Sequence, residues 1–339
     1  MAGILSTGLS LFACLGLAQA VFIPHSYTHD PHAHRSTLVP RASSGCGTKP
    51  RWAFDNSGHF TENTLIAGNQ RTYLVHVPND FNNAVPRPLV LSFHGADGTS
   101  QHQEDASQLS LPGQTIAGRS IVAVYPQGLP GDGRSAAWDA APYADPDAHD
   151  VEFTTAILDD VISTLCIDVT RIYISGKSNG GGFTNRLACT PEVNRHVAAF
   201  GMASGAYYPE SLVGDDCTPG RPIPILLTHG DGDTTVPYHG KPNNGDNTEP
   251  DIDDFAKAWA ERNGYIPATW TYTQSTPHDK TTLWTWGGYG APGQVKRYRV
   301  KGMGHIWPTT VVGSDKAGLS APFNLTQQDL LPFFEQYTL

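Results

Sequence analysis

The chain has 339 residues, of which 39% are hydrophobic, 10% aromatic and 16% charged, and its formal net charge is −10 at pH 7. Seven Trp, 13 Tyr and 13 Phe supply enough apolar surface for a packed core, which excludes disorder of the whole chain. The acidic balance argues against a nucleic-acid-binding protein, and beyond the N-terminus no apolar run approaches the roughly 18 residues of a membrane-spanning helix.

The N-terminal segment differs from the rest of the chain. Ile4 to Ala20 are mostly apolar or small, and Ala18-Gln19-Ala20 matches the cleavage pattern of a secretory signal. Residues 1–20 are therefore predicted to be a signal peptide rather than a buried helix. Residues 21–41 hold four histidines and few core residues, which indicates a pro-segment or disordered linker, with a metal-binding tail as the alternative. We expect a single folded domain over residues 42–339 of a secreted, extracellular protein.

The cysteines and one sequon agree with secretion. Cys14 leaves with the signal peptide, and an even number of cysteines in a secreted chain predicts two disulfides with three allowed connectivities. No Cys and His spacing suggests a zinc site, and nothing suggests another metal or an organic cofactor. Asn324-Leu325-Thr326 predicts glycosylation of Asn324. The four remaining cysteines are Cys46, Cys166, Cys189 and Cys217.

Beyond residue 41, short apolar runs alternate with segments of helical periodicity. This alternation predicts an α/β protein with a mostly parallel central sheet and helices on both of its faces. An inserted hairpin, over 270–273 and 281–286, is predicted before the last strand. The predicted strands are 71–77, 88–93, 120–125, 171–175, 197–202, 223–228 and 295–300, and the predicted helices are 151–165, 180–189, 251–262 and 327–337.

A single G-x-S-x-G motif lies between a predicted strand and a predicted helix. Glycines flank Ser178 in Gly176-Lys177-Ser178-Asn179-Gly180, as a sharp turn with crowded backbone requires. Such a turn would lift the Ser178 hydroxyl above the carboxyl edge of the sheet, at a helix N-terminus that favours developing negative charge. The motif therefore predicts a nucleophilic serine, and an ordinary glycine-rich turn is the alternative.

A serine nucleophile needs a base, and the base needs an orienting acid. Asp233 and His305 each follow a predicted strand, and they come after Ser178 in the order Ser, Asp, His. Asp231 competes with Asp233 for the role of the acid, and either aspartate has a turn residue as its alternative. The rivals of His305 are His229 and His239, which precede the last strand.

Stabilisation of a developing oxyanion needs two backbone donors. One is expected from the N–H group of Asn179, the residue after the nucleophile. The second is expected from the loop His94-Gly95-Ala96-Asp97-Gly98, where Ala96 is the preferred donor and Gly95 the alternative.

Taken together, these stretches resemble the secreted carbohydrate esterases of family 1 type, which include feruloyl and acetylxylan esterases, and the related polyhydroxybutyrate depolymerases. The resemblance covers roughly residues 42–339 and implies the α/β-hydrolase fold, with Ser178, Asp233 and His305 as the triad. Lys177 departs from the aromatic residue that often precedes the nucleophile, and Tyr265 stands where one cysteine of an extra pair is expected. The matching stretches are His94-Gly95, Val124–Gly128, Trp138, Asp150–Phe153, Cys166–Asp168, Arg171–Tyr173, Ser178–Gly181, Leu187–Cys189, His229–Tyr238 and Gly304–Pro308, and the opening Ser44–Gly47 is similar to that of secreted fungal feruloyl esterases.

The resemblance implies a monomeric esterase that releases ferulate from plant cell-wall polysaccharide through an acyl-enzyme. The alternatives are an acetylxylan esterase, a polyhydroxybutyrate depolymerase, or a binding protein on the same fold. It also implies the pairs Cys46–Cys166 and Cys189–Cys217. Aromatic faces suit a feruloyl ring, so Trp138, Trp307 and Tyr238 are candidate substrate contacts, with support of the catalytic loops as the alternative role for Trp307 and Tyr238.

Overall fold

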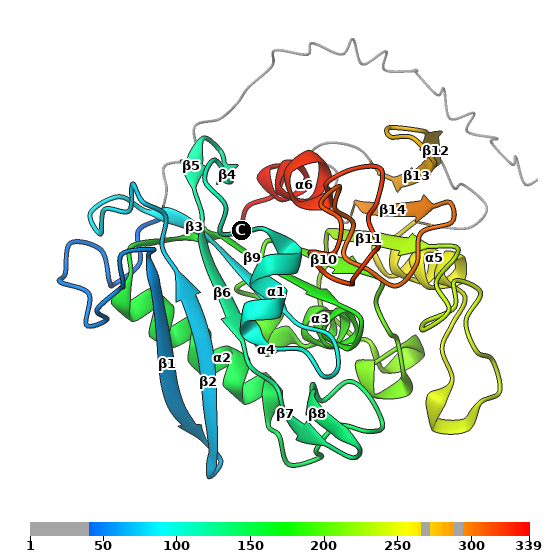
Figure 1. The fold of residues 1–339 in the computed structure, drawn as a ribbon, viewed down its shortest axis with the longest axis horizontal. Coiled ribbons are helices and arrows are strands. Elements are labelled where there is room, and N and C mark those ends of the chain that lie inside the picture. Colours follow the sequence, from blue (N-terminus) through cyan, green and yellow to red (C-terminus); the bar gives the residue numbers. More distant parts are fainter. Residues whose placement is uncertain (1–40, 266–271, 288–293) are drawn as a thin grey trace, which may run out of the picture. The chain divides into compact units, whose positions relative to one another are not determined.

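A mixed sheet lies at the centre of the described residues (Figure 1). The computed structural model describes residues 41–265, 272–287 and 294–339. Within these ranges, ten strands pair in the order β1-β2-β6-β3-β9-β10-β11-β14-β13-β12. The strands from β6 to β14 run parallel, and antiparallel neighbours flank them on both sides. The strands are β1 (His59–Ile66), β2 (Asn69–His76), β3 (Arg87–Phe93), β6 (Val122–Pro126), β9 (Ile167–Lys177), β10 (Ala199–Ala203), β11 (Ile225–Gly230), β12 (Tyr272–Ser275), β13 (Thr281–Trp286) and β14 (Val295–Val300).

Helices cover both faces of this sheet, as the sequence pattern predicted. Alternate residues of the central strands point to opposite faces, so Leu89 and Leu91 of β3 pack in one apolar core and Val90 in the other. The helices are α1 (Ser100–Ser107), α2 (Asp150–Thr164), α3 (Asn179–Cys189), α4 (Pro191–Asn194), α5 (Ile252–Arg262) and α6 (Leu331–Glu335), with a π-helical turn over Thr326–Leu330 and short 3₁₀ turns at Pro209–Ser211, Gly214–Asp216 and Gly245–Asn247.

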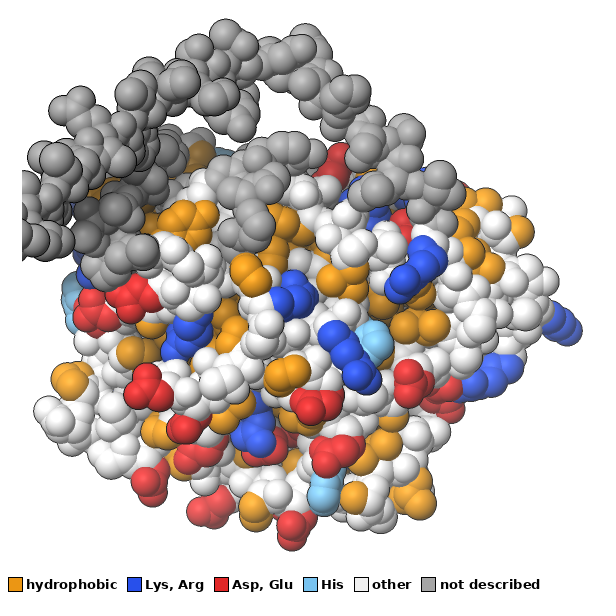
Figure 2. Space-filling model, turned by 180° about the vertical axis from the view of Figure 1, so that it is seen from behind, with side chains coloured by type: hydrophobic (Ala, Val, Ile, Leu, Met, Phe, Trp, Pro, Cys, Tyr) orange, Lys and Arg blue, Asp and Glu red, His pale blue; other side chains and the backbone are white. Residues whose placement is uncertain are grey.

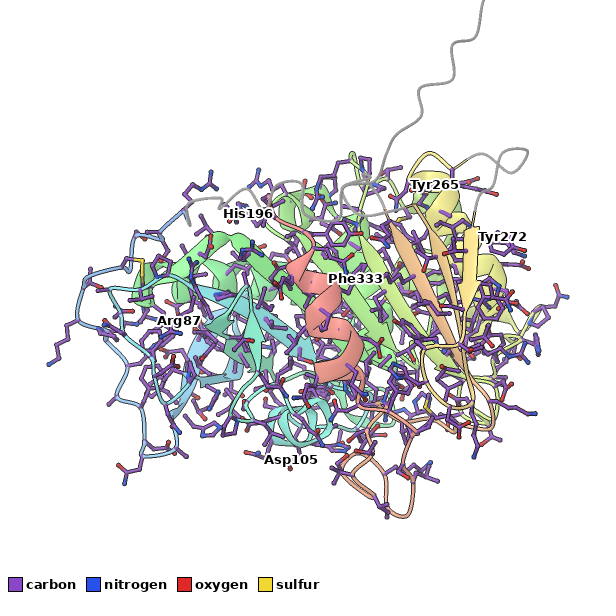
Figure 3. The ribbon with its side chains drawn as sticks, turned by 90° about the horizontal axis from the view of Figure 1, so that it is seen from above. Arg87, Asp105, His196, Tyr265, Tyr272 and Phe333 are labelled. Atoms are coloured by element: carbon purple, nitrogen blue, oxygen red, sulfur yellow. A yellow bond between two sulfur atoms is a disulfide. The ribbon has the colours of Figure 1, made fainter. Side chains whose placement is uncertain are left out.

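The helices divide between the two cores. The first core joins the sheet to α2, α3 and α5, and the second joins it to α1 and α6. Figure 3 shows α6, marked by Phe333, lying across the sheet. There Phe334 stacks on Tyr173 of β9 with ring centroids 4.7 Å apart. A Cβ on Gly201 of β10 would lie 2.3 Å from Leu330, so a larger residue at position 201 would push this segment away.

Most predicted elements are present, with shifts of a few residues at their ends. The strand β1 was missed because its side chains alternate between half-buried and exposed at the edge of the sheet, which leaves a weak apolar pattern. Two short hairpins, β4–β5 (Thr115–Ile116 and Arg119–Ser120) and β7–β8 (Leu129–Gly131 and Arg134–Ala137), and the polar helix α1 were also missed. The inserted hairpin is present as β12 and β13, although residues 270 and 271 lie outside the described residues.

Two disulfides fasten surface segments to the core. Cys46 pairs with Cys166 beside the start of β9, and Cys189 at the end of α3 pairs with Cys217. These are the pairs that the family resemblance implied. A disulfide is visible as a yellow bond in Figure 3.

The parallel register gathers four loops at one edge of the sheet. Phe93 of β3 pairs with Gly176 of β9, and Lys177 pairs with Ala203 of β10. Gly230 of β11 pairs with Val300 of β14. The loops that follow β3, β9, β11 and β14 therefore start side by side, which is where open α/β sheets bind ligands.

Residues Pro40–Leu339 cluster as one compact unit. The predicted signal peptide and nearly all of the predicted pro-segment lie outside the described residues, so those boundaries stay predictions. Among the described helices, none is long and apolar enough to cross a membrane. On the face seen in Figure 2, hydrophobic side chains are interspersed with charged ones.

Candidate active site

Ser178 lies on a tight turn between β9 and α3. Its φ of 56° and ψ of −124° are values that a residue with a side chain adopts only when its surroundings enforce them. A Cβ on Gly176 would lie 2.2 Å from the carbonyl oxygen of Gly180, and a Cβ on Gly180 would lie 2.3 Å from the carbonyl oxygen of Phe93. Both flanking positions therefore require glycine, as the motif predicted.

Three side chains from distant parts of the sequence form one hydrogen-bonded chain. The Nε2 atom of His305 lies 2.8 Å from Oγ of Ser178, and its Nδ1 atom lies 2.7 Å from Oδ2 of Asp233. An ionised carboxylate only accepts hydrogen bonds, so Nδ1 carries the proton and Nε2 accepts from the Ser178 hydroxyl. His305 and Asp233 are buried, whereas Ser178 is half-exposed.

Burial and neighbouring charges set the protonation of this chain. Burial by itself would raise the pKa of Asp233, but hydrogen bonds from His229 and His305 outweigh it and hold that pKa well below its ordinary value. Burial lowers the pKa of His305, the bond to Asp233 opposes this shift, and the Lys177 cation adds to it. An ionised acid beside a neutral imidazole is the state that a general base requires.

The rival residues occupy other positions. Asp231 accepts hydrogen bonds from the Arg299 side chain at 3.1 Å and from the Gly302 N–H group, and it does not contact His305. His239 is largely exposed and pairs with Asp251.

His229 is buried, and its Nε2 atom lies 2.9 Å from the carbonyl oxygen of Val236 and 3.3 Å from Oδ2 of Asp233. It therefore contacts the same carboxylate oxygen as His305 and has no contact with Ser178. The sequence had offered His229 only as a rival base.

The loop after β3 lies against Ser178. A Cβ on Gly95 would lie 3.0 Å from the Ser178 Cβ and 3.6 Å from its Oγ, so any side chain there would crowd the hydroxyl. The N–H group of the next residue, Ala96, has no hydrogen-bond acceptor among the described residues. Asn179 is the first residue of α3. These positions agree with the two donors expected from the sequence.

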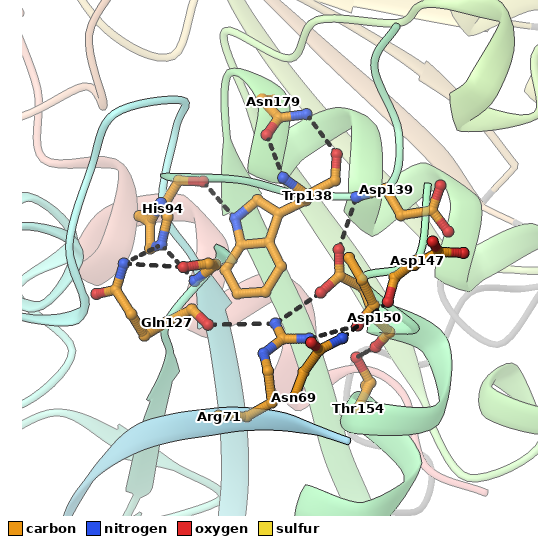
Figure 4. Close-up of polar contacts among 12 residues, drawn as sticks. Asn69, Arg71, His94, Gln127, Trp138, Asp139, Asp147, Asp150, Thr154 and Asn179 are labelled. Carbon is orange, nitrogen blue, oxygen red and sulfur yellow. Dashed lines mark hydrogen bonds and ion pairs between the residues drawn. The ribbon is translucent and has the colours of Figure 1, made fainter. Parts of the chain in front are cut away.

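A buried network holds this loop in place (Figure 4). The Nε2 atom of His94 accepts from the Gly128 N–H group at 3.0 Å, so its Nδ1 atom donates to the Gly95 carbonyl at 2.7 Å. Burial lowers the pKa of His94 to about 4, which keeps the ring neutral. The Gln127 side chain also contacts Nε2 of His94, at 3.3 Å.

The same network extends to a fully buried ion pair. Arg71 of β2 contacts Asp150, the first residue of α2, at 2.6 Å, and neither side chain is exposed. Arg71 also donates to the carbonyl oxygens of Ala148 and Gln127. The family resemblance covers Asp150 and Gln127 but implies no role for either residue. An acidic residue just before an apolar helix is the signal that marks Asp150 as part of a helix start.

The three predicted aromatic contacts are all buried, which differs from the prediction. Trp138 donates its indole N–H to the His94 carbonyl at 2.8 Å. Its backbone N–H group donates to Oδ1 of Asn179, and its backbone carbonyl accepts from Nδ2 of the same side chain. Trp307 donates to Thr326, and Tyr238 packs between Arg297 and Asp253. Each ring is 2% exposed or less, so these rings support the loops and present no free face.

A different aromatic pair packs on the loops next to the candidate site. Tyr143 and Tyr208 pack edge to face with ring centroids 5.7 Å apart, and Tyr143 is partly exposed. Tyr208 shares a small apolar cluster with Val236, which follows the acid, and with Ala206, whose N–H group bonds the Ser178 carbonyl at 2.9 Å. Both tyrosines come from loops without periodicity, so the sequence offered no signal for their proximity.

The predicted glycosylation site is engaged in internal contacts. The amide of Asn324 donates to Gln108 at 2.6 Å, and the buried Thr326 hydroxyl accepts from Trp307 and donates to Ser107. A glycosylated Asn324 would keep one of its two amide N–H groups for this bond, so glycosylation of Asn324 stays a prediction. Among the described residues, no group of three or more His, Cys, Asp or Glu side chains could hold a metal ion.

Sequence comparisons relate the chain to esterases. No family model matches it. It is 30% identical over 170 residues to feruloyl esterase B of Piromyces equi and 27% identical over 269 residues to the bifunctional acetylxylan esterase/xylanase XynS20E of Neocallimastix patriciarum. It is 32% identical over 200 residues to feruloyl esterase D of Neurospora crassa. These matches cover 50%, 78% and 56% of this chain but only 30%, 33% and 61% of the relatives' own lengths.

Solved structures support the fold. A thermostable esterase aligns with a TM-score of 0.54 and 16% identity over 83% of this chain and 63% of its own. The acetyl xylan esterase from Aspergillus awamori aligns with a TM-score of 0.51 and 17% identity over 73% of this chain and 94% of its own. The chain therefore has the α/β-hydrolase fold and is related in sequence to feruloyl and acetylxylan esterases.

Proposed function

We propose that the protein is a serine esterase that hydrolyses feruloyl esters of plant cell-wall polysaccharide. The observation that carries the proposal is the hydrogen-bonded chain from Ser178 through His305 to Asp233. The names of the sequence relatives support the ester class, since they are feruloyl and acetylxylan esterases. The proposal extends to this chain an activity that the comparisons attach to longer proteins.

The reaction proceeds through an acyl-enzyme. His305 takes the proton of the Ser178 hydroxyl while the serine oxygen attacks the ester carbonyl, and it then gives that proton to the departing sugar alkoxide. Water, deprotonated by His305, next attacks the acyl carbonyl and releases the acid and Ser178. Asp233 holds the imidazole in the tautomer that leaves Nε2 free and stabilises the imidazolium.

Two backbone N–H groups stabilise the tetrahedral oxyanion. Asn179 supplies one at the N-terminus of α3, and Ala96 supplies the other from the loop pressed against Ser178. Preorganised donors of this kind need no rearrangement as charge develops, so each contributes roughly 3 kcal/mol to transition-state stabilisation.

The partly exposed ring of Tyr143, backed by the buried Tyr208, supplies aromatic surface for the acyl group, in place of the three buried rings. The guanidinium of Arg134 lies 4.8 Å above the Tyr143 ring and pairs with Asp97 of the loop over residues 94–98, which we call the oxyanion loop. A planar hydroxycinnamoyl ring is matched by such a surface, because aromatic pairs prefer edge-to-face or offset contacts.

Acetylxylan esterase activity is the second candidate. The burial of Trp138, Trp307 and Tyr238 favours it, since an acetyl group needs only a small pocket and no aromatic face.

A side-by-side assay tests the proposal. Methyl ferulate, acetylated xylan and short polyhydroxybutyrate are offered to the wild-type protein and to Ser178→Ala. We expect ferulate release that the variant lacks. Acetate release without cinnamate release would overturn the feruloyl assignment, and activity that survives in Ser178→Ala would overturn the serine mechanism.

Secretion is part of the same proposal. Disulfides persist in oxidising compartments, and the two present here support an extracellular location together with the predicted signal peptide. N-terminal sequencing of the mature protein from the culture medium tests this: a start near residue 42 supports removal of both N-terminal segments.

A further inference from the structure

A buried carboxylate links three elements of the candidate active site. The Asp315 side chain is 2% exposed, and its Oδ1 atom lies 3.0 Å from Nζ of Lys177, the residue before the nucleophile. Its Oδ2 atom accepts the N–H group of Trp307, two residues after His305. His102 of α1, the helix that follows the oxyanion loop, lies 3.4 Å from Oδ1.

Asp315 belongs to a loop that is closed at its base. The Ala321 N–H group donates to the Thr309 carbonyl at 2.7 Å, and this bond joins the two ends of the loop over residues 309–321. Its Leu319 side chain would lie 3.5 Å from a Cβ on Gly304, directly beside the catalytic-loop histidine. A compact loop with joined ends moves as one body, so a single anchor fixes its position.

The charges around Asp315 explain why this anchor is stable. A buried carboxylate is costly unless ion pairs and hydrogen bonds compensate it. Burial would raise the pKa of Asp315, but the contacts with His102, Lys177 and the Trp307 N–H group lower it to about 2. The group is therefore anionic at neutral pH, and it offsets the Lys177 cation, whose charge acts on His305.

We propose that Asp315 is a positioning residue, which holds the loops of the nucleophile and the base in register by joining Lys177, Trp307 and α1 through one carboxylate. The inference rests on the proposed serine esterase function. It also assigns a role to Lys177, the residue that departs from the aromatic one often found before the nucleophile.

Two variants that each remove one charge should shift the acid limb of kcat/KM in opposite directions if the proposal holds. Ser178 and Asp233 contact His305 directly, and Lys177 and His229 act on it electrostatically. In Asp315→Asn the Lys177 cation is no longer offset, so protonation of His305 becomes harder and the acid limb of kcat/KM moves to lower pH. In Lys177→Met the Asp315 anion is no longer offset, so the limb moves to higher pH.

The kinetic constants separate positioning from binding. We expect Asp315→Asn to lower kcat for p-nitrophenyl acetate about tenfold, because a small misplacement of reacting groups is costly, while KM stays within about twofold. We expect the variant that combines Asp315→Asn with Lys177→Met to show a non-additive loss of kcat, since both substitutions break the same contact.

Asp168→Asn is the matched control. Asp168 is equally buried and pairs with Arg119, but it lies at the other end of β9 from Ser178. This variant should not share the effect: per folded molecule, its kcat and acid limb should equal those of the wild type. Folded protein is counted by labelling Ser178 with a fluorophosphonate.

A measurement that does not depend on catalysis distinguishes the role of Asp315 from the proposed esterase function. The pKa of His305 is followed by NMR with isotope-labelled histidine, assigned with His305→Gln. Opposite shifts in Asp315→Asn and Lys177→Met support the network. Unchanged titration and unchanged kcat in both variants would overturn it, even in an active esterase. A wild-type protein without esterase activity would instead refute the proposed function, and the titration would still decide the network.

Discussion

The Nδ1 atom of His305 lies 2.7 Å from Oδ2 of Asp233, although 72 residues separate them in the sequence. Both residues follow neighbouring parallel strands, β14 and β11, whose carboxyl ends meet at one edge of the sheet. The contact therefore follows from the order of the strands.

The contact makes the choice between the two candidate acids testable. Asp233→Asn should lower kcat by about 10⁴, because the amide no longer selects the imidazole tautomer that leaves Nε2 free. Asp231→Asn should retain kcat, since Asp231 contacts Arg299 and Gly302 instead. Steady-state hydrolysis of p-nitrophenyl acetate by the two variants measures this, and equal losses would contradict the assignment.

The nucleophile is the second target. Ser178→Ala should reduce turnover by about 10³ or more, while the fold survives because the substitution removes only the hydroxyl and keeps the Cβ in place. Ser163→Ala, an exposed serine on α2, is the control and should keep full activity. Circular dichroism checks the fold of both variants. Turnover of Ser178→Ala above about one part in a thousand would refute the nucleophile.

The oxyanion loop gives a third prediction. In Gly95→Ala the new methyl group would lie 3.0 Å from the Ser178 Cβ, so the loop must move away from the nucleophile. We expect kcat to fall about 10²-fold with little change in the thermal unfolding midpoint, because one oxyanion donor is displaced. An unchanged kcat would show that the loop does not contribute a donor.

The dependence of activity on pH follows from the state of His305. Burial, opposed by Asp233 and aided by Lys177, lowers its pKa, so the base stays neutral below the ordinary imidazole value of about 6.5. Activity is therefore retained at neutral pH and lost as the pH falls through a value below about 6.5. A profile of kcat/KM against pH checks this, and an acid limb above that value would contradict it.

The buried ion pair predicts a stability effect. Asp150→Asn leaves Arg71 charged and unpaired in the interior, and we expect a loss of about 3–5 kcal/mol in the free energy of unfolding. The surface pair of Lys257 and Asp254 is the comparison, and Lys257→Met should change that free energy by less than about 1 kcal/mol. Urea denaturation followed by fluorescence measures both. Equal effects would show that burial does not set the cost.

The sequence by itself determined the nucleophile turn and the order of the site. Local rules suffice there: crowded backbone at Gly176 and Gly180 requires glycine, and alternating strands and helices bring successive loops to one sheet edge. The rules of chain order also favoured His305 over its rivals.

Only the tertiary structure decided which side chains of those loops meet. It separated Asp233 from Asp231, buried the three predicted aromatic rings, and brought Tyr143 beside Tyr208. It also placed Asp315 against Lys177, across 138 residues of sequence. Such contacts depend on loop conformations and on packing between distant segments, and neither leaves a periodic pattern in the sequence.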